Sequence, residues 1–179
     1  MSLFVVEGAR KSGKTYLVNS QDILPVFKFD FNGAFEGLGL PRNSDNTHYF
    51  GLGKEVMLHQ LDNQKFIRNS IIDRGIITNS VWGIFQNRVS MSEVESELDW
   101  AIKEGLLNTS SFIQIKGTFQ GERTKDLWDT DESRLQEEKD LFEHFFKYVS
   151  DRGVKTHTFY NRFDDLSLDL FKRLIIEIK

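Results

Sequence analysis

The sequence predicts an α/β fold in which a parallel β-sheet is covered by helices on both faces. Five short apolar runs typical of buried strands alternate with longer segments in which apolar residues recur at helical spacing. The first run leads directly into a glycine-rich turn and then into a helical pattern, which is the strand–loop–helix order of an α/β unit. We therefore expect ligands to bind at the carboxyl edge of the sheet, where parallel strands end.

The first strand, predicted over residues 3–6, is followed by a phosphate-binding motif. Residues 8–15 read GARKSGKT and match the P-loop (Walker A) pattern G-x-x-x-x-G-K-[ST] at every fixed position. The glycines let the backbone curl so that N–H groups face phosphate oxygens, and the following helix adds the partial positive charge of its N-terminus. Lys14 would reach the outer phosphates, and the Thr15 hydroxyl would ligate Mg²⁺. The expected phosphate contacts are Gly8, Ala9, Arg10, Lys11, Ser12, Gly13, Lys14, Thr15 and Tyr16.

The next two predicted strands bring acidic residues to the same edge of the sheet. The second strand, residues 26–31, carries Asp30 near its carboxyl end, where a carboxylate could act as a base toward an acceptor hydroxyl. The third strand, residues 70–75, ends in the charged pair Asp73 and Arg74. A buried strand that delivers an aspartate to the ligand edge supplies a second Mg²⁺-directed carboxylate, so we assign Asp73 to the metal site. The alternatives are a solvated carboxylate at Asp30 and an exposed Asp–Arg pair in a turn.

The rest of the chain continues the alternation of strands and helices. Ser92 and Glu95 offer a capping box for a helix that stops at Gly105. The polar segment 118–132 contains Arg123 and Lys125, and we expect it to form a lid over the cleft. The other predicted elements are a loop at 32–53, helices at 54–66, 76–89, 135–149 and 167–178, and strands at 111–117 and 155–160.

Composition excludes several classes of site. The absence of cysteine excludes disulfides, thiolate zinc sites and cysteine nucleophiles, and the four histidines show no metal-ligand spacing. A net charge of −4 gives no overall attraction to nucleic acid, and the apolar runs are too short to span a bilayer. With 179 residues and no signal-peptide pattern at its start, the chain is expected to be one cytoplasmic domain, residues 1–179.

Two motifs together resemble those of the nucleoside and nucleotide kinases, especially the thymidylate kinase-like group. Glu7-Gly8 followed by Gly13-Lys14-Thr15 looks like the group's E-G-x-x-x-x-G-K-[ST]. Asp73-Arg74 followed by Ser80 and Gln86 is similar to its D-R-Y…S…Q stretch. The resemblance covers most of the chain. It implies the three-layer P-loop NTPase fold, with a five-stranded parallel sheet of order 2-3-1-4-5, and it implies ATP and Mg²⁺ as cofactors.

The resemblance also implies roles for single residues. Arg74 would grip the acceptor or its phosphate, Arg123 would close over the transferring phosphoryl group, and Asn161 and Arg162 would lie beside the adenine. Three features depart from the group: Arg10 replaces a usually acidic residue, Gly75 replaces an aromatic one, and no T-R-E-P-like signature follows the second strand. Deoxynucleoside kinases have a carboxylate near the end of the second strand that acts as the base for the sugar hydroxyl. Asp30 occupies a similar place, without the proline that usually follows.

The function that the sequence favours is transfer of the γ-phosphoryl group of ATP to a (deoxy)nucleoside monophosphate or a (deoxy)nucleoside. A nucleic-acid 5′ end and a non-nucleotide metabolite are the alternative acceptors. A second class of function is a nucleotide-binding switch, or a lapsed kinase fold that binds without transfer. The lack of an N-K-x-D guanine motif counts against the switch. The resemblance is compatible with a homodimer.

Overall fold

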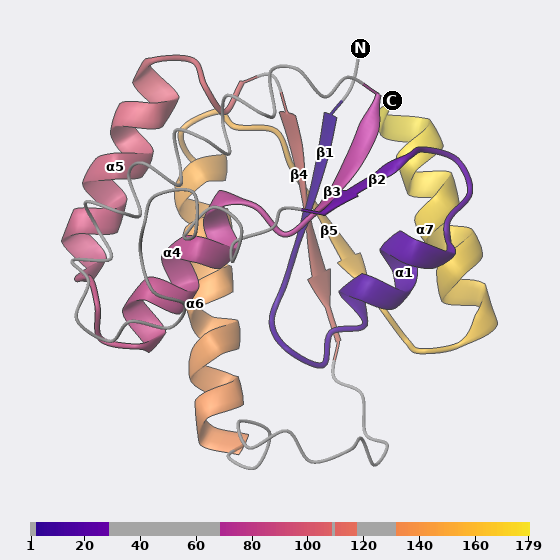
Figure 1. The fold of residues 1–179 in the computed structure, drawn as a ribbon, viewed down its shortest axis with the longest axis horizontal. Helices are drawn as coiled ribbons and strands as arrows, with labels where there is room; N and C mark the ends of the chain where they lie inside the picture. The colour runs from indigo at the N-terminus through magenta and orange to yellow at the C-terminus, as the bar shows by residue number, and fades with distance from the viewer. Residues whose placement is uncertain (1–2, 29–68, 109, 118–131) are drawn as a thin grey trace, which may run out of the picture.

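The computed structural model describes residues 3–28, 69–108, 110–117 and 132–179, and these residues build a three-layer α/β/α arrangement (Figure 1). The central layer is one parallel sheet with the strand order β2-β3-β1-β4-β5, which confirms the predicted order 2-3-1-4-5. Its strands are β1 (Leu3–Glu7), β2 (Val26–Lys28), β3 (Ser70–Asp73), β4 (Ser110–Lys116) and β5 (Thr156–Tyr160). Strand β1 is therefore central, with β3 on one side and β4 on the other.

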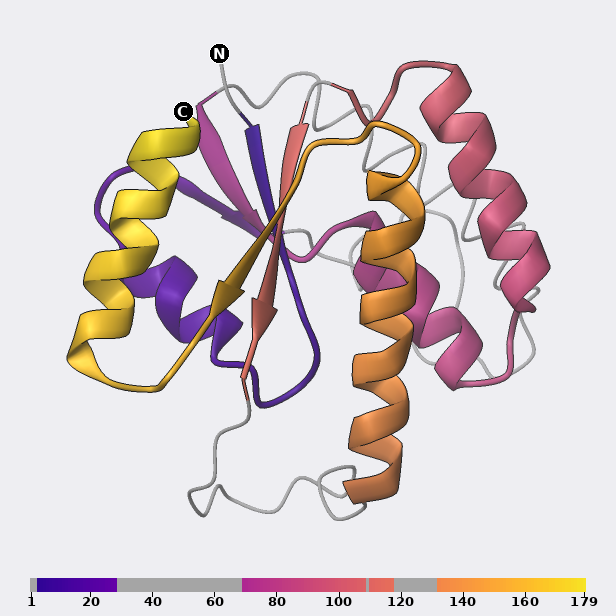
Figure 2. The same cartoon turned by 180° about the vertical axis from the view of Figure 1, so that it is seen from behind.

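Helices cover both faces of the sheet, as predicted (Figures 1 and 2). Helices α1 (Lys14–Ser20) and α7 (Asp165–Ile178) lie on one face. Helices α4 (Ile76–Phe85), α5 (Met91–Lys103) and α6 (Glu132–Ser150) lie on the other. Each face has its own apolar core. Phe4 and Val6 belong to the α1/α7 side and Val5 to the α4/α6 side, because successive side chains of a strand point to opposite faces.

The carboxyl ends of the strands gather the predicted site at one end of the molecule. In Figure 2 the arrows of β4 and β5 point toward the end where the loop between β1 and α1 lies. Strands β1 and β3 are buried along their whole length, which explains why their sequences are continuous apolar runs without polar alternation. The sheet thus places the residues after β1, β3, β4 and β5 next to one another.

Several predicted boundaries differ from the observed ones. Helix α4 ends at Phe85 instead of residue 89, and α6 begins at Glu132, before the apolar pattern that starts at residue 135. The capping box of α5 is formed by Ser90 and Glu93, so the prediction of Ser92 and Glu95 is wrong. Both pairs fit the S-x-x-E pattern. The helix starts earlier because Met91 packs against the core and belongs to its first turn.

Several predictions fall on residues 29–68 and 118–131, which lie outside the described part of the chain. These are Asp30, the loop at 32–53, the helix at 54–66, Arg123 and Lys125 and most of the proposed lid. Within the described ranges, none of the helices has the length and apolar character needed to cross a bilayer.

The capping box of α5 yields a stability prediction. Ser90→Ala should lower the free energy of unfolding by about 1 kcal/mol, because the Ser90 side chain accepts a hydrogen bond from the Glu93 N–H at 3.3 Å. Ser96→Ala is the matched control, since Ser96 lies inside the helix and is exposed; it should change stability by a few tenths of a kcal/mol. Urea unfolding of both variants measures the difference, and equal losses would contradict the assignment of the cap.

Candidate functional site

The P-loop curls tightly between the end of β1 and the start of α1. Gly8 and Gly13 have φ values of 153° and 77°, in the region that glycine adopts readily. A Cβ atom on Gly8 would lie 2.5 Å from the carbonyl oxygen of Ile115, and one on Gly13 would overlap the side-chain amide of Asn161. Both glycines of the motif are therefore required by backbone conformation and by close packing against β4 and the chain after β5.

Asn161 holds the P-loop through a side-chain hydrogen bond. The residue follows β5 and is 6% exposed, and its Nδ2 donates a hydrogen bond to the Ser12 carbonyl at 3.0 Å. Its Oδ1 accepts from the Phe163 N–H at 2.9 Å, while its own N–H donates to the Lys116 carbonyl at 2.8 Å. Asn161 and Arg162 were predicted to lie beside the adenine. In the structure the Asn161 side chain holds the P-loop, and Arg162 is exposed. Contact of either residue with adenine stays a prediction.

Lys14 is a buried ammonium surrounded by charged groups from three other elements. It is 5% exposed, and burial and the Arg74 guanidinium lower the pKa of Lys14 to about 8. The carboxylates of Asp73, Glu7 and Glu138 oppose this shift. The structure thus brings Lys14, Asp73 and Arg74 together, as the sequence predicted.

Asp73 has the environment expected of a metal-directed carboxylate. It ends β3 next to Val6, is 8% exposed, and its Oδ1 is buried with no hydrogen-bond partner among the described residues. Ser12 Oγ in the P-loop is buried without a partner in the same sense. Buried polar atoms are normally paired, so these two atoms are candidate contacts for a bound ligand.

Magnesium fits this donor set. Mg²⁺ prefers oxygen ligands and is usually held by one or two protein groups together with substrate phosphates and water. Thr15, the other predicted ligand, is exposed at the start of α1, which leaves its hydroxyl accessible. The described residues contain no group of three or more acidic or histidine side chains that could hold a metal without such help. Asp73 and Thr15 would therefore bind Mg²⁺ with the phosphates of a nucleotide.

Arg74 lies at the surface in an unusual backbone conformation. Its φ is 75°, which is uncommon for a residue with a side chain, and its N–H donates to the Val6 carbonyl at 3.0 Å. The next residue, Gly75, donates its N–H to the Glu7 carboxylate at 3.0 Å. Burial raises the pKa of Glu7, and hydrogen bonds from Thr78 and the backbone oppose that rise. The turn that carries Arg74 is thus tied to the end of β1.

Sequence reasoning missed a buried acid on α6 that holds the P-loop. Glu138 is 1% exposed and accepts from the Arg10 backbone N–H at 2.9 Å and from Arg10 Nε at 2.6 Å. The Arg10 guanidinium also lies over Trp82 and Phe85 of α4, 5.4 and 5.3 Å from the ring centroids. A signal existed, because Glu138 interrupts the apolar face of α6 between Leu135 and Leu141. Arg10 was predicted to contact the nucleotide. In the structure its side chain already contacts α6 and α4.

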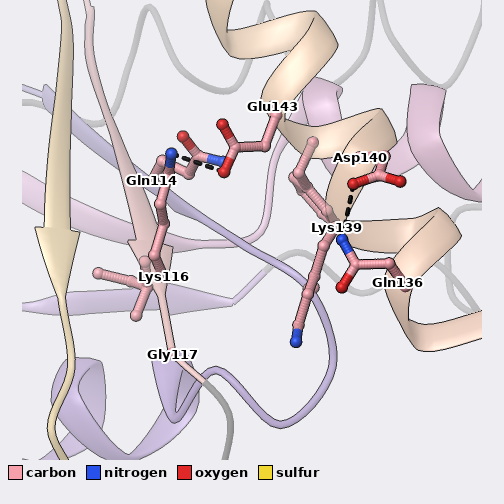
Figure 3. A pocket seen from close by; sticks show the side chains of 10 residues that line it. Gln114, Lys116, Gly117, Gln136, Lys139, Asp140 and Glu143 are labelled. Carbon is pink, nitrogen blue, oxygen red and sulfur yellow. Dashed lines mark hydrogen bonds and ion pairs between the residues drawn. The ribbon is translucent and has the colours of Figure 1, made fainter. Parts of the chain in front are cut away.

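A small cavity borders the P-loop between β4 and α6 (Figure 3). Lys116 forms an ion pair with Glu143 at 2.6 Å at one end, and Lys139 extends from α6 toward the other. The volume of about 160 Å³ is below that of pockets that enclose a whole drug-sized ligand. It is lined by Ala9, Gln114, Ile115, Lys116, Gly117, Gln136, Lys139, Asp140, Phe142 and Glu143.

Comparison with known proteins places the fold among the P-loop nucleoside and nucleotide kinases. No protein-family model and no curated protein sequence matches the chain. A deoxyadenosine kinase structure from M. mycoides superposes with a TM-score of 0.64 at 16% identity, covering 99% of this chain and 100% of that one. A thymidylate kinase from Ehrlichia chaffeensis gives a TM-score of 0.55 at 12% identity, with coverage of 99% and 97%. NadR protein gives 0.56 at 12% identity, covering 97% of this chain and 48% of that one. The predicted resemblance is confirmed at the level of the fold.

The lowered pKa of Lys14 predicts a pH dependence for nucleotide binding. The ammonium form attracts phosphate, and a bound triphosphate would raise the pKa of Lys14 above its value of about 8 in the free protein. Affinity should therefore be full below pH 8 and fall by up to about tenfold per pH unit above it. Calorimetric titration with Mg²⁺-free ATP from pH 7 to 9.5 measures this slope.

Lys14→Arg provides the control for that titration. Arginine stays charged over the whole range, so the variant should bind more weakly than wild type yet show little change with pH. A wild-type affinity that does not fall above pH 8, or an equal slope in both proteins, would contradict the role assigned to Lys14.

Proposed function

We propose that this protein is a kinase that transfers the γ-phosphoryl group of ATP to a (deoxy)nucleoside or a (deoxy)nucleoside monophosphate. One observation carries the proposal: buried Lys14 at the start of α1 lies in the electrostatic field of Asp73 and Arg74 at the end of β3. A cation for the phosphates, a carboxylate for Mg²⁺ and a guanidinium for the acceptor are the parts that phosphoryl transfer needs, because its catalysis is mainly positioning and charge stabilisation.

Each part has a proposed role in the transfer. The P-loop backbone and Lys14 bind the β- and γ-phosphates, and Asp73 and Thr15 hold the metal. Bound Mg²⁺ would neutralise charge on the phosphate oxygens. Arg74 lies exposed on the turn after β3 and is therefore available to meet a second substrate. The other cofactor-binding residues stay as proposed from the sequence, including Tyr16, exposed on α1, and Arg162 after β5.

The acceptor class rests on the similar proteins and on two residues proposed from sequence. The deoxyadenosine kinase structures hold dCMP and dCDP, dCTP or dATP, and NadR was solved with NAD and AMP-PNP or with NR. These ligands support a nucleoside or nucleotide acceptor and a purine triphosphate donor. Asp30 as the base and Arg123 as the arginine that closes over the phosphoryl group remain proposals, and both lie outside the described residues.

An ADP-release assay tests the function. Purified protein with ATP and Mg²⁺ should release ADP only when a suitable nucleoside or nucleoside monophosphate is added from a panel of both. Lys14→Ala should lower this turnover by about 10²-fold or more, because it removes a cation aimed at developing charge. Release of ADP without any acceptor would favour a nucleotidase or switch, and turnover near the wild-type rate in Lys14→Ala would contradict the site.

The two residues at the end of β3 should give different kinetic signatures. Asp73→Asn should raise the Mg²⁺ concentration needed for half-maximal turnover, because Asp73 Oδ1 is a buried oxygen with no hydrogen-bond partner among the described residues. Arg74→Ala should lower kcat/KM for the acceptor by about 10- to 100-fold and leave the Mg²⁺ requirement unchanged. Steady-state kinetics with varied Mg²⁺ and varied acceptor separate the two effects. Small, equal effects would indicate an ordinary surface pair.

A further inference from the structure

Glu7, the last residue of β1, is a fully buried carboxylate that receives four hydrogen-bond donors. Its Oε1 accepts from the backbone N–H groups of Gly75 and Ile77, at 3.0 and 3.1 Å. Its Oε2 accepts from the Thr78 N–H at 3.2 Å and from the Thr78 hydroxyl. The side chain has no exposed surface, so water does not replace these contacts. Every donor comes from the turn after β3 or from the first turn of α4.

This carboxylate caps a helix from a distant part of the chain. Helix α4 begins at Ile76, and its own N-cap residue is Gly75, which has no side chain and makes no cap hydrogen bond. The first N–H groups of a helix have no partner within the helix, and an anion near them is stabilising. Glu7 therefore supplies what the local sequence of α4 lacks.

The same junction holds the backbone of Arg74. The Arg74 N–H donates to the Val6 carbonyl, and the following N–H, of Gly75, donates to Glu7. Between these two hydrogen bonds Arg74 keeps a φ of 75°, a conformation that costs free energy for a residue with a side chain. The last two residues of β1 thus hold the turn that presents the Arg74 guanidinium, and the P-loop begins at the next residue, Gly8.

We propose that Glu7 is a positioning residue that fixes the Arg74 turn relative to the P-loop. The inference rests on the proposed function, in which Arg74 meets the acceptor and the P-loop holds the donor. Glu7 contacts neither substrate in this scheme. It acts through the α4 N-terminus, so that the acceptor-binding guanidinium and the phosphate cradle keep one relative placement, and a loss of placement of about 1 Å is enough to impair transfer.

The four hydrogen-bond donors around the Glu7 side chain require a carboxylate and not an amide. All four partners are donors, and an ionised carboxylate offers acceptors only. In Glu7→Gln the amide NH₂ would face N–H or O–H donors on one side, leaving at least one buried donor unpaired in a side chain of almost the same shape. Thr78→Val is a milder companion variant, because it removes the hydroxyl donor and keeps all three backbone donors.

The first experiment measures how firmly the turn after β3 is held, and it does not depend on enzyme activity. Amide hydrogen exchange at Gly75, Ile77 and Thr78 should be faster in Glu7→Gln than in wild type, while exchange in β4 stays unchanged. Glu93→Gln is the matched control, since Glu93 is also a carboxylate at a helix N-terminus but lies at α5, away from the site. It should leave these amides as they are. Unchanged exchange in Glu7→Gln would overturn the proposal, whether or not the protein proves to be a kinase.

The second experiment asks whether Glu7 acts through Arg74. At pH 6.5, where Lys14 is protonated, Glu7→Gln should keep ATP binding and lower acceptor kcat/KM by about 10- to 100-fold. In the double variant Glu7→Gln/Arg74→Ala, acceptor kcat/KM should equal that of Arg74→Ala alone. Thr78→Val should show the same pattern with a smaller loss, and it replaces Glu7→Gln if that variant does not fold.

The outcomes separate the proposal from the proposed function. Multiplicative losses in the double variant, or loss of ATP binding in Glu7→Gln at pH 6.5, would overturn the positioning role while leaving the kinase intact. Absence of acceptor-dependent turnover in wild type would remove the kinase, and the hydrogen-exchange result would still decide whether Glu7 holds the turn.

Discussion

The carboxyl end of β1 is the constraint on which the rest of the site depends. Because β1 is the central strand, its last residues contact both neighbouring strands and both sides of the sheet. Glu7 holds the turn after β3, Gly8 packs against the Ile115 carbonyl of β4, and Arg10 reaches Glu138 on α6. A P-loop placed on an edge strand would have only one such neighbour. The central position therefore lets one short segment set the relative placement of the P-loop, the turn after β3 and α6.

The buried charged groups around the P-loop differ in how far the protein itself pairs them. Lys14 lies among the carboxylates of Glu7, Asp73 and Glu138, and burying charged groups is tolerable only when they are paired or hydrogen-bonded. Glu7 is satisfied by α4 and Glu138 by Arg10, whereas Asp73 Oδ1 has no partner within the described ranges. Of the three acids, Asp73 is thus the one with an oxygen available to the Mg²⁺ that the proposed function requires.

Much of this structure followed from local sequence signals, and the misses have two physical causes. Strand runs, the P-loop and the Asp73-Arg74 pair are short-range patterns, so they predicted the sheet and the grouping of the site. The roles of Glu138 and Asn161 come from contacts with residues 128 and 149 positions away, which no local pattern encodes. The cap of α5 was missed for another reason: two overlapping S-x-x-E patterns were equally good, and packing of Met91 decided between them.

Arg10 bears on the proposed acceptor, because the thymidylate kinase-like group that the sequence resembles usually carries an acidic residue at this P-loop position. A cation there would by itself favour a more anionic acceptor. Here its guanidinium is paired with buried Glu138 at 2.6 Å and lies over Trp82 and Phe85, so its charge is compensated within the protein. A buried pair of this kind contributes little net field to a neighbouring substrate. Under the proposed function, recognition of acceptor charge would therefore fall to Arg74, whose exposed side chain and fixed backbone distinguish it from Arg10.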